Sequence, residues 1–332
     1  MGFFMDEIKT SLWDWYLQHG RRLPWRVSPC MVPPNDHAYR VLVSEIMLQQ
    51  TTVSTVLGRF EPFLQRFPDV QTLADADLEE VHDAWAGLGY YRRATNLHAC
   101  AQVVCTEFGG QFPTTAKQLR VLPGLGPYTS SALASICFGE DIMPVDGNIE
   151  RIVARFYAIK TPLPKARKAL SLHAQDFCAV GKTGHLAQAL MDLASQVCKP
   201  LKTDCQSCPL RLGCKARDVD PLQLPVKAPK LPPKSMRWIF LLSYNERFVG
   251  VERRPKKGVM AGMLGFPVVM KLPDDAIYKG QVQHRLTHLD ITADVFVRPQ
   301  RTIAQVIPRQ QDALQAMPTL MRKVGIRSGL FG

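Results

Sequence analysis

Residues 122–151 constrain the fold of this chain more than any other stretch, because they combine a Gly-rich turn, a short apolar helix, a loop and an acidic helix start. Gly124 and Gly126 lie two residues apart, so the backbone there can adopt positive φ and approach a partner closely. Residues 129–138 predict a helix whose first amide groups point out of the turn and can bind an anion. Asp146 then precedes another apolar-periodic run, and Asp is a residue type that favours a helix start. The stretch therefore predicts an anion-binding hairpin followed by a helix that begins at Asp146.

Each part taken alone also has an ordinary structural interpretation. A Gly-x-Gly turn before a helix occurs in many folds, and Asp146 could act only as a helix cap. For each part alone, the ordinary interpretation is the favoured one. If the turn does bind an anion, the natural anion is a nucleic-acid phosphate, because 41 Lys and Arg against 29 Asp and Glu leave a formal net charge of +12. Such a chain suits a nucleic-acid partner, although many basic proteins bind none.

A second landmark is the run 41–57, which predicts a mostly buried helix and carries Glu45 among aliphatic side chains. An unpaired carboxylate in such surroundings is costly, so burial raises its pKa. A raised carboxyl pKa is what a general acid needs at neutral pH. The alternative places Glu45 on a solvent face beside Ser44 and Gln49, and the residues alone leave both interpretations open.

Residues 86–93 combine two glycines, two tyrosines and two arginines in that order. Tyr90 and Tyr91 after a tight turn suit insertion into a base stack, with the arginines pairing nearby phosphates. Packing of the two tyrosines on a neighbouring helix is an equally open interpretation.

The nine cysteines divide into five scattered residues and a cluster of four within 198–214. The scattered residues lie mostly in apolar helical surroundings, where buried reduced thiols are expected. Ligation by four cysteines is typical of [4Fe–4S] clusters, and the spacing leaves a zinc site open as the less favoured alternative. The clustered residues are Cys198, Cys205, Cys208 and Cys214.

The character of the chain changes after the cysteine cluster. Residues 219–234 hold five prolines and three lysines, as expected of a stiff basic linker. Helical periodicity dominates before this segment, and a predicted β-hairpin over 238–251 follows it. We therefore predict an all-helical domain over 1–218, a linker over 219–236 and a small α+β domain over 237–332.

Composition excludes several classes of protein. Hydrophobic residues make up 46% and charged residues 21%, which fits a globular protein rather than a disordered one. The chain has no apolar run long enough to cross a bilayer, and its first residues lack the pattern of a signal peptide. We therefore expect a soluble cytoplasmic protein.

The segments 45–51, 87–91, 122–128 and 145–148 and the four cysteines, in this order, resemble the MutY-type adenine DNA glycosylases. The resemblance is dense over residues of about 10 to 215 and looser beyond. It implies a helix-hairpin-helix catalytic domain with a [4Fe–4S] cluster on the four cysteines, and a C-terminal α+β domain of the MutT or Nudix type. It also implies that a monomer hydrolyses the N-glycosidic bond of adenine mispaired with 8-oxoguanine or guanine in double-stranded DNA, as part of base-excision repair.

The resemblance implies roles for single residues of the reaction site. Glu45 matches the acid that protonates the departing adenine, and Asp146 matches the carboxylate that stabilises the cationic sugar. Asn148 matches a residue that supports this pair. Tyr128 stands where relatives of the endonuclease III type carry a lysine that attacks the sugar, and a tyrosine cannot form a Schiff base. The implied enzyme therefore cuts only the glycosidic bond, with water as the nucleophile.

The resemblance also implies contacts with the duplex. The glycine hairpin would clamp phosphates, three residues would occupy or wedge the duplex near the lesion, two would line the adenine pocket, and a C-terminal turn would read 8-oxoguanine. Leu286 departs from the aromatic residue that is usual in that turn. In the same order, the residues are Gly124, Leu125 and Gly126; Gln50, Thr51 and Tyr90; Arg26 and Gln188; and Leu286, Thr287 and His288.

Two rival hypotheses are less well supported. An endonuclease III-like enzyme acting on oxidised pyrimidines is disfavoured by Tyr128 and by the extra C-terminal domain. A non-enzymatic DNA-binding protein is disfavoured because both Glu45 and Asp146 are present. The leading hypothesis requires these two acids to line one cleft.

Overall fold

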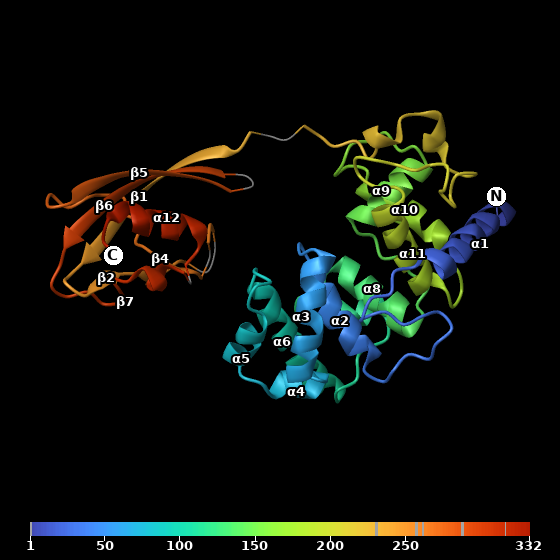
Figure 1. The fold of residues 1–332 in the computed structure, drawn as a ribbon, viewed down its shortest axis with the longest axis horizontal. Coiled ribbons are helices and arrows are strands. Elements are labelled where there is room, and N and C mark those ends of the chain that lie inside the picture. The colour runs from blue at the N-terminus through green and yellow to red at the C-terminus, as the bar shows by residue number, and fades with distance from the viewer. Residues whose placement is uncertain (1, 230–231, 256–257, 261, 287–288, 316) are drawn as a thin grey trace. The chain divides into compact units, whose positions relative to one another are not determined.

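The computed structural model describes residues 2–229, 232–255, 258–260, 262–286, 289–315 and 317–332. It divides into two compact units, Met1–Ala228 and Pro229–Gly332. In Figure 1 the first unit runs from blue to yellow and the second from orange to red. The division falls inside the Pro- and Lys-rich segment, and the first strand of the second unit already begins at Lys234.

The first unit is built from helices, as the 3.6-residue periodicity of its sequence predicts. None of the described helices is long and apolar enough to cross a membrane. The helices are α1 (Gly2–His19), α2 (His37–Leu48), α3 (Val53–Arg66), α4 (Val70–Asp75), α5 (Leu78–Ala84), α6 (Arg92–Phe108), α7 (Ala116–Leu119), α8 (Pro127–Phe138), α9 (Gly147–Phe156), α10 (Arg167–Ala174) and α11 (Thr183–Gln196), with short 3-10 helices η1 (Gln175–Phe177), η2 (Lys215–Asp218) and η3 (Pro221–Gln223).

Two hydrophobic cores stabilise this unit. Helices α2 to α8 enclose the first, which includes the fully buried side chains of Phe60 and Trp85. Helices α1, α9, α10 and α11 enclose the second, which includes Leu12 and Phe177. Because α11 packs on both α8 and α9, it joins the two halves of the unit.

The prediction of one continuous helix over 41–57 is wrong. Helix α2 ends at Leu48, and the chain turns through Gln50 at φ 58° before α3 begins. Thr52 caps α3, because its hydroxyl accepts a hydrogen bond from the Thr55 amide. The guanidinium of Arg93 donates hydrogen bonds to the carbonyl groups of Ile46 and Met47 at the end of α2. A cap residue and a distant arginine therefore break a helix that local periodicity would continue.

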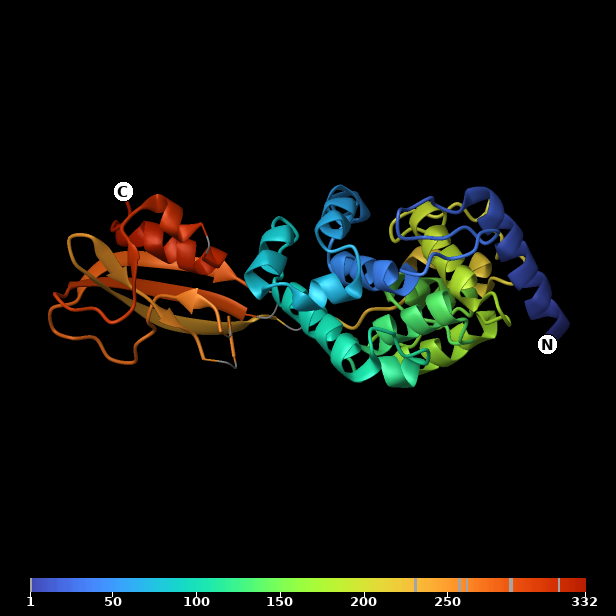
Figure 2. The ribbon, with the colours of Figure 1, turned by 90° about the horizontal axis from the view of Figure 1, so that it is seen from below.

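The second unit contains a five-stranded mixed sheet in the order β5-β6-β1-β2-β7. Strand β1 pairs in parallel with β6 along its length, and the other neighbours in this sheet are antiparallel. Helix α12 (Thr319–Ser328) packs on β5 and β6, and Figure 2 shows this red helix against one face of the sheet. The strands are β1 (Lys234–Tyr244), β2 (Phe248–Gly250), β5 (Ile277–Arg285), β6 (Leu289–Pro299) and β7 (Val306–Pro308), and β3 (Glu252–Arg253) and β4 (Leu264–Gly265) form a separate pair.

The predicted hairpin of β1 and β2 is present, and the Asn245 side chain closes its turn by accepting hydrogen bonds from the Arg247 and Phe248 amides. Strand β7 was not predicted from the sequence and lies at the edge of the sheet. This strand forms because Val306–Pro308 pairs along β2 at the sheet edge, where a non-local partner overrides local propensity.

Candidate active site

A pocket of about 360 Å³ lies where the two halves of the first unit meet. Helices α2 and α8 form one wall, and the start of α9 together with α11 forms the other. Glu45 and Asp146, which are far apart in the sequence, both line it. Of the residues singled out from the sequence, the lining includes Arg26, Glu45, Thr51, Tyr128, Asp146, Asn148 and Gln188, whereas Gln50, Tyr90, Gly124, Leu125 and Gly126 lie outside it.

Glu45 projects from α2 into this pocket and is only 9% exposed, so the solvent-face alternative is wrong. Burial, the largest influence, and the charge of nearby Asp146 raise the pKa of its carboxyl group, with a net value of about 7. A hydrogen bond with Tyr128 and the charge of Arg26 act in the opposite direction. A substantial fraction of Glu45 is therefore protonated at neutral pH.

Tyr128 holds its position because α8 begins one residue earlier. Gly126 is the N-cap in an extended conformation, and Pro127 occupies the first helical position, where a missing amide hydrogen costs nothing. Burial and the neighbouring acids raise the pKa of the Tyr128 phenol well above its ordinary value. The hydroxyl therefore remains protonated and available to donate to the Glu45 carboxylate.

Asp146 is the N-cap of α9 and also faces the pocket. One carboxylate oxygen accepts from the amides of Asn148 and Ile149 at 2.9 and 2.8 Å, and the other accepts from the Asn148 side-chain amide at 2.7 Å. These donors and the N-terminal dipole of α9 stabilise a negative charge at this position. Asp146 therefore both caps α9 and contributes a carboxylate to the pocket.

A buried arginine connects this acid to the cysteine loop. Arg151 donates to the Asn148 side-chain oxygen at 3.2 Å and to the carbonyl groups of Ala194 and Cys198 at 2.9 and 3.1 Å. The sequence analysis missed this residue. Its signal is an arginine on the apolar face of a short helix, three residues after Asn148.

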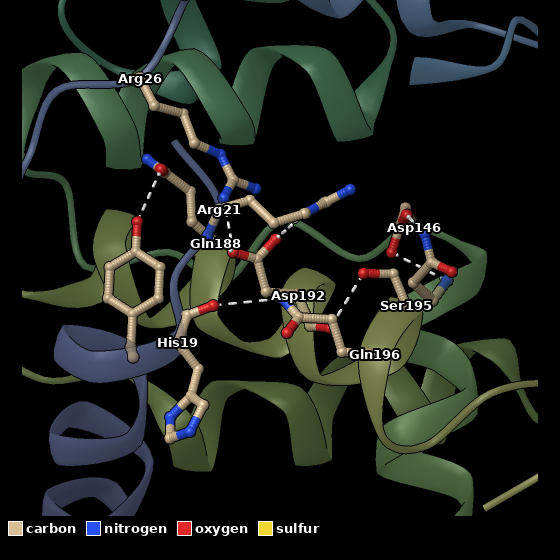
Figure 3. A network of polar contacts seen from close by, with 10 residues as sticks. His19, Arg21, Arg26, Asp146, Gln188, Asp192, Ser195 and Gln196 are labelled. Atoms are coloured by element: carbon tan, nitrogen blue, oxygen red, sulfur yellow. Dashed lines mark hydrogen bonds and ion pairs between the residues drawn. The ribbon is translucent and has the colours of Figure 1, made fainter. Parts of the chain in front are cut away.

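A second buried network holds the opposite wall of the pocket. The Asp192 carboxylate of α11 binds Arg21 and Arg26, and the Gln188 side-chain oxygen accepts from the Tyr16 hydroxyl at 3.0 Å (Figure 3). Gln188 is 4% exposed and faces the pocket one helical turn before Asp192. The sequence analysis assigned no role to Asp192.

Gln50 and Tyr90, two of the three residues predicted to occupy or wedge the duplex, lie on loops that Arg93 holds together. Gln50 and Tyr90 both adopt positive φ, 58° and 47°, which is uncommon for residues other than glycine. The Arg93 guanidinium donates to the carbonyl groups of Gln49 and Leu88, one on each loop. One buried side chain therefore holds both strained turns.

The two tyrosines of this turn differ in their surroundings. Tyr90 is 66% exposed, whereas Tyr91 packs edge-on against the ring of His82, with the ring centroids 5.5 Å apart. The packing alternative therefore applies to Tyr91, and Tyr90 is free to meet a ligand.

Only one glycine of the hairpin uses the conformational freedom that its sequence allows. Gly124 adopts φ 79°, and a Cβ there would lie 2.7 Å from the Cβ of Asn96. Gly126 is extended, with φ −83°, so the backbone uses positive φ at Gly124 and not at Gly126. Leu125 between them is buried and anchors the hairpin in the first core.

The four clustered cysteines line one small pocket beside α9. Arg155 donates to the Cys198 sulfur at 3.1 Å and to the carbonyl group of Lys199 at 2.8 Å, so a buried cation supports this loop. In the part of the chain that the structure describes, no three ligand-type side chains converge tightly enough to hold a single metal ion. Four cysteine side chains that line one pocket are a donor set that Fe–S clusters and zinc sites both use.

Of the predicted reader turn in the second unit, the structure describes Leu286. Leu286 is partly buried against the sheet core, and its amide donates to the Leu289 carbonyl group at 2.8 Å. Thr287 and His288 lie outside the described residues.

The fold and the acidic pocket together define a helical DNA glycosylase of the helix-hairpin-helix class. The family described as "HhH-GPD superfamily base excision DNA repair protein" matches residues 43–175. The solved structure of a thermostable thymine-DNA glycosylase superposes with a TM-score of 0.55 at 27% identity, covering 65% of this chain and 95% of that one.

Sequence relatives narrow the class further. The chain is 30% identical to the human adenine DNA glycosylase over 96% of its own length and 73% of the relative's. It is 32% identical to the adenine DNA glycosylase of Buchnera aphidicola subsp. Baizongia pistaciae, over 80% of this chain and 74% of that one. The chain belongs to the adenine DNA glycosylase family, whose members hydrolyse N-glycosyl bonds in base-excision repair.

Proposed function

We propose that this glycosylase removes adenine paired with 8-oxoguanine, or with guanine, from duplex DNA and leaves the strand uncut. The observation that supports this proposal most is the pair of carboxyl groups in one pocket: burial raises the pKa of Glu45 to about 7, and Asp146 accepts three N–H hydrogen bonds. Glycosidic bonds break through a cationic sugar, so their cleavage needs a proton donor and a counter-charge.

In the proposed mechanism Glu45 is the general acid. A base inside a stacked duplex cannot reach a buried carboxyl group, so the adenine is first extruded into the pocket. Glu45 then donates its proton to a ring nitrogen as the bond between the sugar C1′ and the base N9 breaks, and adenine leaves as a neutral molecule. Asp146 lies near the positive charge that develops on the sugar and stabilises it.

Water completes the reaction. It adds to C1′ and returns a proton to the Glu45 carboxylate, which restores the acid. No lysine is among the described residues that line the pocket, and Tyr128 cannot form a Schiff base. The proposed enzyme is therefore monofunctional.

We further propose that Cys198, Cys205, Cys208 and Cys214 hold a [4Fe–4S] cluster. When bound, the cluster would be a structural node that folds the basic loop around it and keeps that loop close to DNA phosphates. Metal analysis of protein purified without oxygen should give about four iron atoms per chain. A zinc content near one atom with no iron would contradict this assignment.

For the second unit we propose a MutT-like role in reading 8-oxoguanine opposite the excised adenine, with Leu286, Thr287 and His288 in the reading turn. The support for this role is the family resemblance and the mixed α+β sheet with α12 on one face.

One experiment tests the proposed substrate. Single-turnover assays on A:8-oxoguanine, A:G and thymine-glycol duplexes should give adenine release from the first two, fastest from the first, and no thymine-glycol release. A variant with Thr287→Ala and His288→Ala should lose much of the preference for 8-oxoguanine over guanine while it still releases adenine. Equal rates for the two mispairs in the wild type would contradict the proposed specificity.

A further inference from the structure

Asp192 is a fully buried carboxylate, 0% exposed, in the middle of α11. Its Oδ1 accepts from the Arg21 side-chain Nε at 2.6 Å, and its Oδ2 accepts from the Arg21 amide at 2.8 Å and from Arg26 Nη1 at 2.7 Å. Figure 3 shows both arginines converging on this one group, with Gln188 beside them. A buried carboxylate is tolerated only with such partners.

The two arginines line the same pocket as Glu45. The Arg26 side chain is only 9% exposed, and that of Arg21 is 29% exposed. Asp192 binds both the backbone amide of Arg21 and the guanidinium of Arg26. It therefore fixes both ends of the segment 21–26 in the pocket wall. Removal of the carboxylate would leave two cations in the wall without a counter-charge.

We propose that Asp192 is a positioning residue for adenine excision: it holds Arg26 in the pocket wall beside the extruded base and balances the charge of Arg26 there. The inference rests on the proposed role of Glu45 as the proton donor. Asp192 on α11 would thereby influence the protonation of Glu45 on α2.

The charges around Glu45 support this assignment. Arg26 is the cation that acts on the Glu45 carboxyl group and lowers its pKa, whereas burial and Asp146 raise it. Loss of the Asp192 charge would strengthen the field of Arg26 at Glu45. The titratable and charged groups that face Glu45 are Tyr128 and Cys137 of α8, Asp146 at the start of α9, and Arg26. The groups that face Arg21 and Arg26 are Asp192 and His185 of α11 and Tyr16 of α1.

The direction of the predicted effect follows from these charges. Glu45 must be protonated to act, so the rate falls as the pH rises through its pKa. In Asp192→Asn the unbalanced Arg26 lowers that pKa, and the alkaline limb of the rate profile moves down by about one pH unit. At pH 8 this shift alone reduces the rate about tenfold. In Arg26→Gln the cation is gone and the limb moves to higher pH.

The test is the single-turnover rate of adenine release between pH 5.5 and 9 for the wild type, Asp192→Asn, Arg26→Gln and the double variant. The limb of the double variant should match that of Arg26→Gln, because Asp192 acts through Arg26. Glu61→Gln is the control: this residue pairs with Arg40 at 3.1 Å on the surface of the same unit and lies outside the pocket. Its limb should match that of the wild type.

Two outcomes would overturn the inference. If Asp192→Asn lowers the rate by one factor at every pH and leaves the limb in place, Asp192 only supports the fold. If Asp192→Asn does not fold, the Arg26→Gln variant tests the inference, because in that variant Asp192 still pairs with Arg21. An alkaline limb of Arg26→Gln at the wild-type pH would then refute the effect of Arg26 on Glu45. A wild type with no alkaline limb would instead refute Glu45 as the acid, which separates failure of the proposed function from failure of this inference.

Discussion

The two halves of the glycosylase unit each present a carboxyl group to the pocket, and the two carboxyl groups have different surroundings. Glu45 comes from the side of a helix in the first core, where aliphatic neighbours and burial raise its pKa to about 7. Asp146 comes from the start of a helix in the second half, where three N–H donors converge on it. The same functional group is thus buried among apolar side chains on one wall and hydrogen-bonded by N–H groups on the other.

The comparison teaches that the backbone position of an acid, more than its type, assigns its role. A side chain in mid-helix meets neighbouring helices, and its own backbone amides are already paired. A side chain at the N-cap meets free amides and the positive end of the helix dipole. If the comparison is correct, substitutions at the two positions should fail in different ways.

The largest effect is expected at the acid. Glu45→Gln keeps the shape of the side chain but has no acidic proton, so adenine release should slow about a thousandfold. Single-turnover rates on an A:8-oxoguanine duplex measure the loss, and binding of the same duplex should stay close to the wild-type value. A rate within tenfold of the wild type would mean that another group supplies the proton.

A somewhat smaller loss is expected at the counter-charge. Asp146→Asn keeps a good N-cap but removes the charge, so the rate should fall about a hundredfold while the protein stays folded and binds DNA. Asp146→Ala is the matched comparison, because it also loses the cap and should cost about 1 kcal/mol of unfolding free energy. A loss of duplex binding as large as the loss of rate in Asp146→Asn would contradict the assigned role.

The smallest effect is expected in the free energy of unfolding. It reports the burial of Glu45 independently of its role in catalysis. Because the folded pKa of Glu45 lies above its unfolded value of 4.5, the folded state holds the extra proton between about pH 4.5 and 7. Wild-type stability should therefore fall relative to Glu45→Gln as the pH rises through this window, by at most about 3 kcal/mol in total.

Denaturant unfolding of the wild type and Glu45→Gln at pH 4.5 and pH 8 measures this difference. Parallel pH profiles for the wild type and Glu45→Gln would show that Glu45 is not a penalised buried acid.

Much of the first unit could be predicted from local signals. Helical periodicity located its main helices, and the cap preference of Asp146 located the start of α9. Family motifs located the residues now found in one pocket. The break between α2 and α3 and the pairing of β7 were missed, because each depends on a partner remote in the sequence: Arg93 in one case and β2 in the other.

By itself, then, the sequence determined the helical class of the first unit and predicted a second, α+β part and two candidate acids, because each of those signals is carried by residues close together in the chain. Only the tertiary structure decided that Glu45 is buried and that Asp192 balances Arg26. Burial and charge pairing arise from side chains that folding brings together from distant segments, and no local pattern records which partner each charge will meet.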